Sequence, residues 1–146
     1  MSQTSTSTTD TIIEEITIKG SAERIFDAIV DPKQRVRWWG KKGVYESTHA
    51  ESDTRVGGKW LMKGIGMGRD FSVYGEYRKV DRPLLLEFTW NPSWQDGSTE
   101  SIVRFELNEK EGVTTVRLTH SGLTPAGREA HKGWPQVLGW LRDYVE

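Results

Sequence analysis

The sequence contains no cysteine, so disulfides, thiolate nucleophiles and cysteine-ligated zinc sites are excluded. No apolar run approaches the roughly 20 residues of a membrane-spanning helix, and the N-terminus carries no charged-then-apolar signal peptide. The formal net charge is −1, so no basic excess favours nucleic acid or an anionic membrane surface. These absences predict a cytoplasmic protein with no membrane span and no nucleic-acid partner.

Tryptophan, by contrast, is abundant, with seven residues in a chain of 146. An indole combines a large apolar area with an N–H group that needs a hydrogen-bond partner when buried. Such a count suits the lining of a pocket, a packed core or a partner surface. The tryptophans stand at positions 38, 39, 60, 90, 94, 134 and 140.

Chain length and an even composition after the first ten residues predict one domain, over residues 11–146. Residues 1–10 are rich in serine and threonine. Such a polar segment cannot bury enough apolar surface to order itself, so a disordered tail is expected there.

The first forty residues combine one strand with two short helices. Residues 11–19 alternate between apolar and polar, which predicts a strand with one buried face. Ser21 is a favourable N-cap for a helix that runs to Val30 and ends at Asp31-Pro32. Residues 33–39 predict a second short helix.

From Gly43 onward the apolar pattern changes to a period of two. It predicts strands over residues 44–50, 59–63, 71–80, 84–90, 99–108 and 113–120. Strands joined by short turns pair as an antiparallel meander. Residues 64–68 (GIGMG) are expected to form a mobile loop that makes a hairpin turn, and residues 91–97 a loop that carries an exposed Trp94.

The last fourteen residues predict an amphipathic helix, with Pro135 in its first turn. Thr124-Pro125 is expected to begin a shorter helix before it. A sheet with one apolar face must be covered, and the helices are the large covers available. The pattern therefore predicts an α+β fold in which a curved antiparallel sheet wraps around this helix. Its apolar stripe consists of Trp134, Val137, Leu138, Leu141, Tyr144 and Val145.

Several short segments resemble motifs of the SRPBCC, or START-like, superfamily, in the branch named after the activator of Hsp90 ATPase. Residues 31–40 resemble its "DP…RWW" segment, and Gly57-Gly58-Lys59-Trp60 its glycine-rich strand entry. The similarity continues in order along the chain, from Thr11 to Glu146. Its other segments are Gly75-Glu76-Tyr77, Arg82-Pro83-Leu84, residues 118–123 (LTHSGL), and Gly133-Trp134 with Leu138 and Leu141.

This resemblance implies a helix-grip fold of the START or Bet v 1 type. In that fold a curved antiparallel sheet grips a long C-terminal helix, two short helices follow the first strand, and a cavity lies between sheet and helix. Members bind lipids and other apolar molecules, sequester antibiotics, cyclise polyketides or stimulate a chaperone ATPase. Fold alone does not choose among these activities.

A cavity for an apolar ligand is lined mainly by aromatic and aliphatic side chains. Met67 and the loops over residues 64–68 and 91–97 are expected at the edge of the cavity's opening. For any single tryptophan, a position in the packed core is an equal alternative. No cofactor or metal is expected. The candidate wall residues are Trp38, Trp39, Trp60, Met62, Phe71, Tyr77, Phe88, Trp90, Phe105, His120, Trp134, Leu138 and Leu141.

His120 falls on the inward parity of its predicted strand. It could act on a ligand as a general base or hydrogen-bond donor. The structural alternative, which is favoured, is that it satisfies a buried backbone group or a tryptophan N–H. His49 and His131 share no metal-ligand spacing with it.

Three functions therefore remain open. The leading one is a carrier, sensor or sequestering protein for a lipid-like, polyketide-like or flavonoid-like molecule, with a cavity of roughly a few hundred Å³. The second is a stress-response module that binds a chaperone, and the third a cyclase-like enzyme that uses His120. A monomer or weak homodimer is expected.

Overall fold

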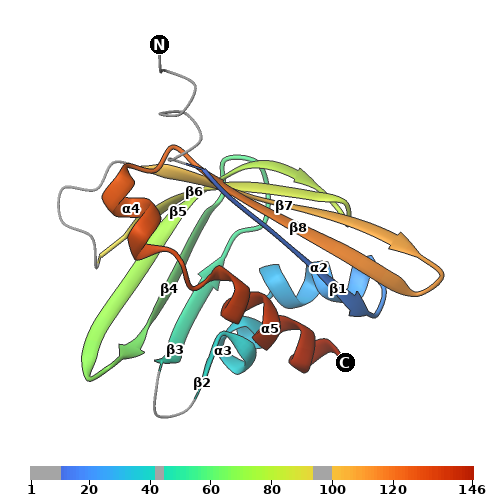
Figure 1. Ribbon diagram of the computed structural model, residues 1–146, viewed down its shortest axis with the longest axis horizontal. Coiled ribbons are helices and arrows are strands. Elements are labelled where there is room, and N and C mark those ends of the chain that lie inside the picture. The colour runs from blue at the N-terminus through green and yellow to red at the C-terminus, as the bar shows by residue number, and fades with distance from the viewer. Residues whose placement is uncertain (1–10, 42–44, 94–99) are drawn as a thin grey trace.

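In the residues that the structure describes, eight antiparallel strands form one curled sheet (Figure 1). The computed structural model describes residues 11–41, 45–93 and 100–146, so the predicted tail and Trp94 lie outside it. The strands are β1 (Ile12–Lys19), β2 (Gly40–Lys41), β3 (Tyr45–Ser52), β4 (Lys59–Gly66), β5 (Arg69–Asp81), β6 (Leu85–Pro92), β7 (Ser101–Lys110) and β8 (Val113–Ser121).

The described helices are α2 (Ala22–Val30), α3 (Pro32–Trp38), α4 (Pro125–Ala130) and α5 (Trp134–Val145). Side-chain caps fix where three of them begin. Ser21 Oγ accepts from the Arg24 N–H at 3.1 Å, Asp31 Oδ1 from the Lys33 N–H at 3.0 Å, and Thr124 Oγ1 from the Gly127 N–H at 3.0 Å. The starts predicted at Ser21 and Thr124 are thus confirmed.

The strand order along the sheet is β1-β8-β7-β6-β5-β4-β3-β2. Helix α5 contacts both edge strands, β1 and β2, and also α2 and α3. It therefore bridges the two ends of the curled sheet, as Figure 1 shows. The helix-grip arrangement expected from the sequence is confirmed. No helix among the described residues has the length and apolarity needed to cross a membrane.

One continuous core lies between the sheet and the helices. Ile25, Phe26 and Ile29 of α2 and Leu141 of α5 are fully buried in it. The inward faces of β6, β7 and β8 supply the opposite side of this core, with side chains at alternate positions as the period of two requires. These strand residues are Leu86, Phe88, Trp90, Val103, Phe105, Leu107, Val116, Leu118 and His120.

The GIGMG segment forms a hairpin turn, as predicted, but the turn is shorter than the loop expected over residues 64–68. Strand β4 continues to Gly66, and a turn at Met67-Gly68 leads into β5. The glycines serve packing here: a Cβ on Gly64 would lie 2.4 Å from the Phe71 ring. Glycine therefore lets an aromatic side chain of the neighbouring strand lie flat against β4.

Candidate functional site

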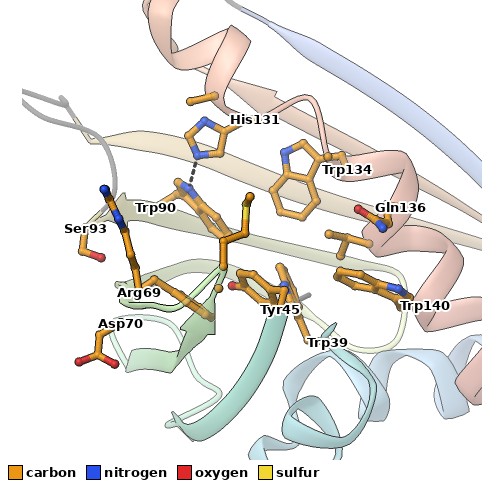
Figure 2. A pocket seen from close by; sticks show the side chains of 16 residues that line it. Trp39, Tyr45, Arg69, Asp70, Trp90, Ser93, His131, Trp134, Gln136 and Trp140 are labelled. Carbon is orange, nitrogen blue, oxygen red and sulfur yellow. Dashed lines mark hydrogen bonds between the residues drawn. The ribbon is translucent and has the colours of Figure 1, made fainter. Parts of the chain in front are cut away.

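A pocket of about 1050 Å³ lies between the β4–β5 hairpin and the first half of α5 (Figure 2). It is open to solvent beside Met67, whose side chain is 90 % exposed. The sequence predicts an enclosed cavity of roughly a few hundred Å³. The pocket in the structure is larger and more open than that. Its lining consists of Trp39, Tyr45, Gly66, Met67, Arg69, Asp70, Phe71, Trp90, Ser93, Ala130, His131, Gly133, Trp134, Gln136, Val137 and Trp140.

Three tryptophans form the floor of the pocket. The rings of Trp39 and Trp90 are stacked with centroids 6.2 Å apart, and the Trp134 ring meets Trp39 edge-on at 5.8 Å. Each is at most 5 % exposed. They come from the end of α3, from β6 and from the start of α5. The floor thus joins the short helices, the sheet and the C-terminal helix.

A second group of aromatic rings forms the side wall. Tyr45 of β3 stacks on Phe71 of β5 at 4.1 Å, and on its other side faces Trp140 of α5 at 6.2 Å. Burial raises the pKa of the Tyr45 hydroxyl, an effect that its hydrogen bond with Trp39 partly opposes. Tyr45 therefore stays protonated and is a neutral member of the wall, with its ring between Phe71 and Trp140.

Trp39 is held in place by a buried cation, Arg35. The Arg35 guanidinium lies 5.7 Å from the Trp39 ring and 5.3 Å from the Trp60 ring. Its Nε and Nη2 both donate to the carbonyl of Ile29 in α2, at 2.9 and 2.5 Å. The neighbouring Trp38 donates to the Ala28 carbonyl at 2.7 Å. These bonds fix α3 against α2 and direct Trp39 into the floor.

Two buried histidines accept the indole N–H groups of two floor tryptophans. The indole N–H of Trp134 donates to His120 Nδ1 at 3.0 Å, and that of Trp90 to His131 Nε2 at 3.0 Å. Because an indole only donates, each accepting nitrogen carries no proton. The other nitrogens meet Ser101 Oγ at 2.7 Å and the Gly127 carbonyl at 2.7 Å, respectively.

Both imidazoles are neutral in this setting. Burial, together with the nearby His131, lowers the pKa of His120 to about 3. Burial also lowers the pKa of His131, although its hydrogen bond to Gly127 opposes the shift. The structural role expected for His120, as the partner of a tryptophan N–H, agrees with this geometry. No group of three or more histidine, aspartate or glutamate side chains is placed to hold a metal ion in the described part of the chain.

The structure brings part of the predicted wall together at the pocket. Trp39, Phe71, Trp90 and Trp134 line it, and Gly66, Met67 and Ser93 of the two predicted edge segments lie at its border. The other candidates are buried beneath the pocket or elsewhere in the core, all at most 3 % exposed. These are Trp38, Trp60, Met62, Tyr77, Phe88, Phe105, His120, Leu138 and Leu141.

Several lining residues are absent from the sequence-based set. Tyr45, Val137 and Trp140 are half-buried, and Gln136 is exposed. The sequence pattern selects side chains on the buried face of each strand or helix. These residues lie at the border of the pocket and are only partly buried, so the pattern does not select them. The α5 stripe did contain a usable signal, since Val137 lies on its edge one turn after Trp134.

The comparisons with known proteins agree with this architecture. The family model described as "Activator of Hsp90 ATPase homolog 1-like protein" matches residues 19–146. No curated protein gives a significant match.

Solved structures show the same fold. Protein CV1439 from Chromobacterium violaceum has a TM-score of 0.82 at 23 % identity, over 94 % of this chain and 98 % of that one. Protein Ms6760 from Mycobacterium smegmatis has a TM-score of 0.81 at 19 % identity, over 95 % and 90 % of the two chains. The AHSA1-like protein from Aeromonas hydrophila is 25 % identical, with a TM-score of 0.73 over 92 % of each chain. The chain therefore belongs to the family of activator of Hsp90 ATPase homolog 1-like proteins.

Proposed function

We propose that this protein binds a planar, aromatic small molecule of the polyketide or flavonoid type, as a carrier or sensor. The observation that carries the proposal is the pocket of about 1050 Å³ between two groups of aromatic rings. Helix-grip proteins of this superfamily commonly bind hydrophobic ligands, so the site lies on a suitable fold.

The arrangement of the rings favours a planar ligand over a fatty acid. Trp39, Trp90 and Trp134 form a floor, and Tyr45, Phe71 and Trp140 form a wall. Stacked or edge-on aromatic contacts contribute about 0.5–1.5 kcal/mol each beyond the burial of apolar area. A flat polycyclic molecule gains such contacts on two sides, whereas an alkyl chain gains only apolar burial.

Substituting Val137 by arginine tests this site. Val137 lies at the pocket on the half-buried border of α5, so Val137→Arg places a long charged side chain in the binding space. Leu84→Arg is the matched control, since Leu84 is 53 % exposed and does not line the pocket. A panel of flavonoids, polyketides and fatty acids is titrated against each protein by calorimetry.

We expect at least one planar aromatic compound to bind the unmodified protein and Leu84→Arg equally, and Val137→Arg weakly or not at all. Binding of fatty acids alone would contradict the choice of ligand class. Equal binding by both variants would contradict the choice of site.

A second candidate follows from the description of the matching family, which refers to activation of a chaperone ATPase. In that case the protein changes the ATPase rate of Hsp90 when the two are mixed, and Val137→Arg retains the effect. An unchanged ATPase rate would remove this candidate.

The geometry supports a non-enzymatic role over a cyclase. His120 is fully buried, has both ring nitrogens in hydrogen bonds and does not line the pocket. A general base must reach the proton that it removes. We place the binding in the cytoplasm, in keeping with a chain that has no cysteine.

A further inference from the structure

The charged side chains at the pocket are Arg69 and Asp70, which open β5 at the tip of the β4–β5 hairpin. Successive strand residues point to opposite faces of a sheet. Arg69 shares its face with Phe71, which is 8 % exposed and lines the pocket. Asp70 shares its face with Tyr74, which is 57 % exposed on the outer side. Strand parity therefore places Arg69, which is itself exposed, on the pocket side of β5 and Asp70 on the outer side.

Figure 2 shows the same division at the level of side chains. The guanidinium of Arg69 extends along the mouth of the pocket toward Ser93, while the carboxylate of Asp70 points away. Within residues 11–41, 45–93 and 100–146, none of the ion pairs involves Arg69. The cation at the mouth is thus available to a ligand.

The other polar groups at the pocket are uncharged. His131 is held neutral, with Nε2 accepting from Trp90 and Nδ1 bonded to the Gly127 carbonyl. Ser93 Oγ accepts from the Ser72 N–H at 2.8 Å and contributes a hydroxyl, and Gln136 contributes an amide. The site therefore combines aromatic walls with one exposed cation at its mouth.

We infer that the pocket selects aromatic acids, whose rings lie between the floor and the wall while Arg69 binds their anionic group. This inference rests on the proposed function and specifies its ligand class. A guanidinium presents parallel N–H donors that match the two oxygens of a carboxylate or sulfonate. An uncharged analogue of the same shape keeps the aromatic contacts and loses this ion pair.

Two fluorescent probes with the same ring system test the inference. Anilinonaphthalene sulfonate is anionic, and N-phenylnaphthylamine is its neutral counterpart without the sulfonate. The dissociation constants of both are measured for the unmodified protein, Arg69→Gln and Arg117→Gln. Arg117 is the matched control, because it lies on β8 beside Glu15 and does not line the pocket.

In Arg69→Gln we expect the preference for the anionic over the neutral probe to fall by about two- to fivefold, the range for a single solvent-exposed ion pair. Affinity for the neutral probe stays unchanged, and Arg117→Gln behaves like the unmodified protein. Raising the salt concentration reduces the preference in the unmodified protein more than in Arg69→Gln.

An unchanged preference for the anionic probe in Arg69→Gln would overturn the inference. If Val137→Arg still loses the binding of both probes, the pocket proposal remains standing. Failure of both probes to bind, or binding of both that Val137→Arg does not affect, would overturn the proposed function and this inference together.

Discussion

The indole N–H of Trp134 donates a 3.0 Å hydrogen bond to Nδ1 of His120, and this bond ties the first residue of α5 to β8. On its other side, His120 Nε2 lies 2.7 Å from Ser101 Oγ in β7. One buried imidazole thus links the C-terminal helix to two strands, directly below the pocket floor. The position of the floor depends on it.

Replacing His120 by phenylalanine preserves the ring but removes both hydrogen bonds. The Trp134 N–H and the Ser101 hydroxyl then lose a partner in the core, and each such group costs about 1–3 kcal/mol. We expect the free energy of unfolding, measured in urea, to fall by about 2–4 kcal/mol. His49→Phe is the control, because His49 lies at the surface beside Glu51. Equal stabilities of the two variants would show that His120 has no anchoring role.

The lowered pKa values of His120 and His131 make stability depend on pH. In the unfolded chain a histidine binds a proton near pH 6.5, whereas His120 in the folded protein stays neutral down to about pH 3. Acidification through this window protonates only the unfolded state. The free energy of unfolding should therefore fall by up to about 1.4 kcal/mol per pH unit for each such histidine.

Urea unfolding at a series of pH values between neutrality and pH 3 measures this slope. His120→Phe should show a shallower dependence, because one of the two buried histidines is gone. A stability that is constant or rises on acidification would contradict the neutral assignment of these rings.

Gly64 is required by the aromatic wall. A Cβ at this position would lie 2.4 Å from the Phe71 ring and 2.2 Å from the Glu46 carbonyl oxygen. Gly64→Ala should lower the free energy of unfolding by about 1–3 kcal/mol, the range for overpacking. Gly139→Ala is the opposite control: Gly139 lies inside α5 with open space around it. Gly139→Ala should stabilise the protein by about 0.5–1 kcal/mol. A loss of stability in this variant would contradict the finding that a side chain at position 139 meets no neighbour.

Replacing Arg35 by lysine should destabilise the folded protein. Its planar guanidinium, 3 % exposed, lies against Trp39 and Trp60 and donates twice to Ile29. An ammonium lacks the planar face and is more strongly hydrated. Arg35→Lys should cost about 2–4 kcal/mol in unfolding free energy, whereas Arg37→Lys at an exposed position of the same helix should change it little. Similar unfolding free energies in Arg35→Lys and Arg37→Lys would contradict the role of Arg35 in supporting the floor.

The fold could be predicted from the sequence because local patterns determine it. The period of two locates the strands from β3 to β8, and the caps at Ser21 and Thr124 locate two helix starts. The exception is the length of the GIGMG turn, because glycine usually marks a loop whereas β4 continues to Gly66. There glycine makes room for Phe71, and a contact between neighbouring strands has no local signal.

The site could be predicted only in part. Inward parity identifies buried side chains, but it does not distinguish those that face empty space from those that face other side chains. Trp60 and Phe88 have the same pattern as Trp90, yet only Trp90 lines the pocket. The border residues Tyr45 and Arg69 come together because both pair with Gly66 of β4, and no single segment encodes this strand register.

The proposed function requires that the pocket between the β4–β5 hairpin and the first half of α5 binds a planar aromatic ligand. An amide NMR titration with flavonoid and polyketide compounds tests it most directly. We expect chemical-shift changes concentrated at Tyr45, residues 66–71, His131 and residues 133–140, with Val56 and Val113 unchanged. Absence of shifts with every compound, in a protein shown to be folded, or shifts confined to residues outside the pocket, would contradict it.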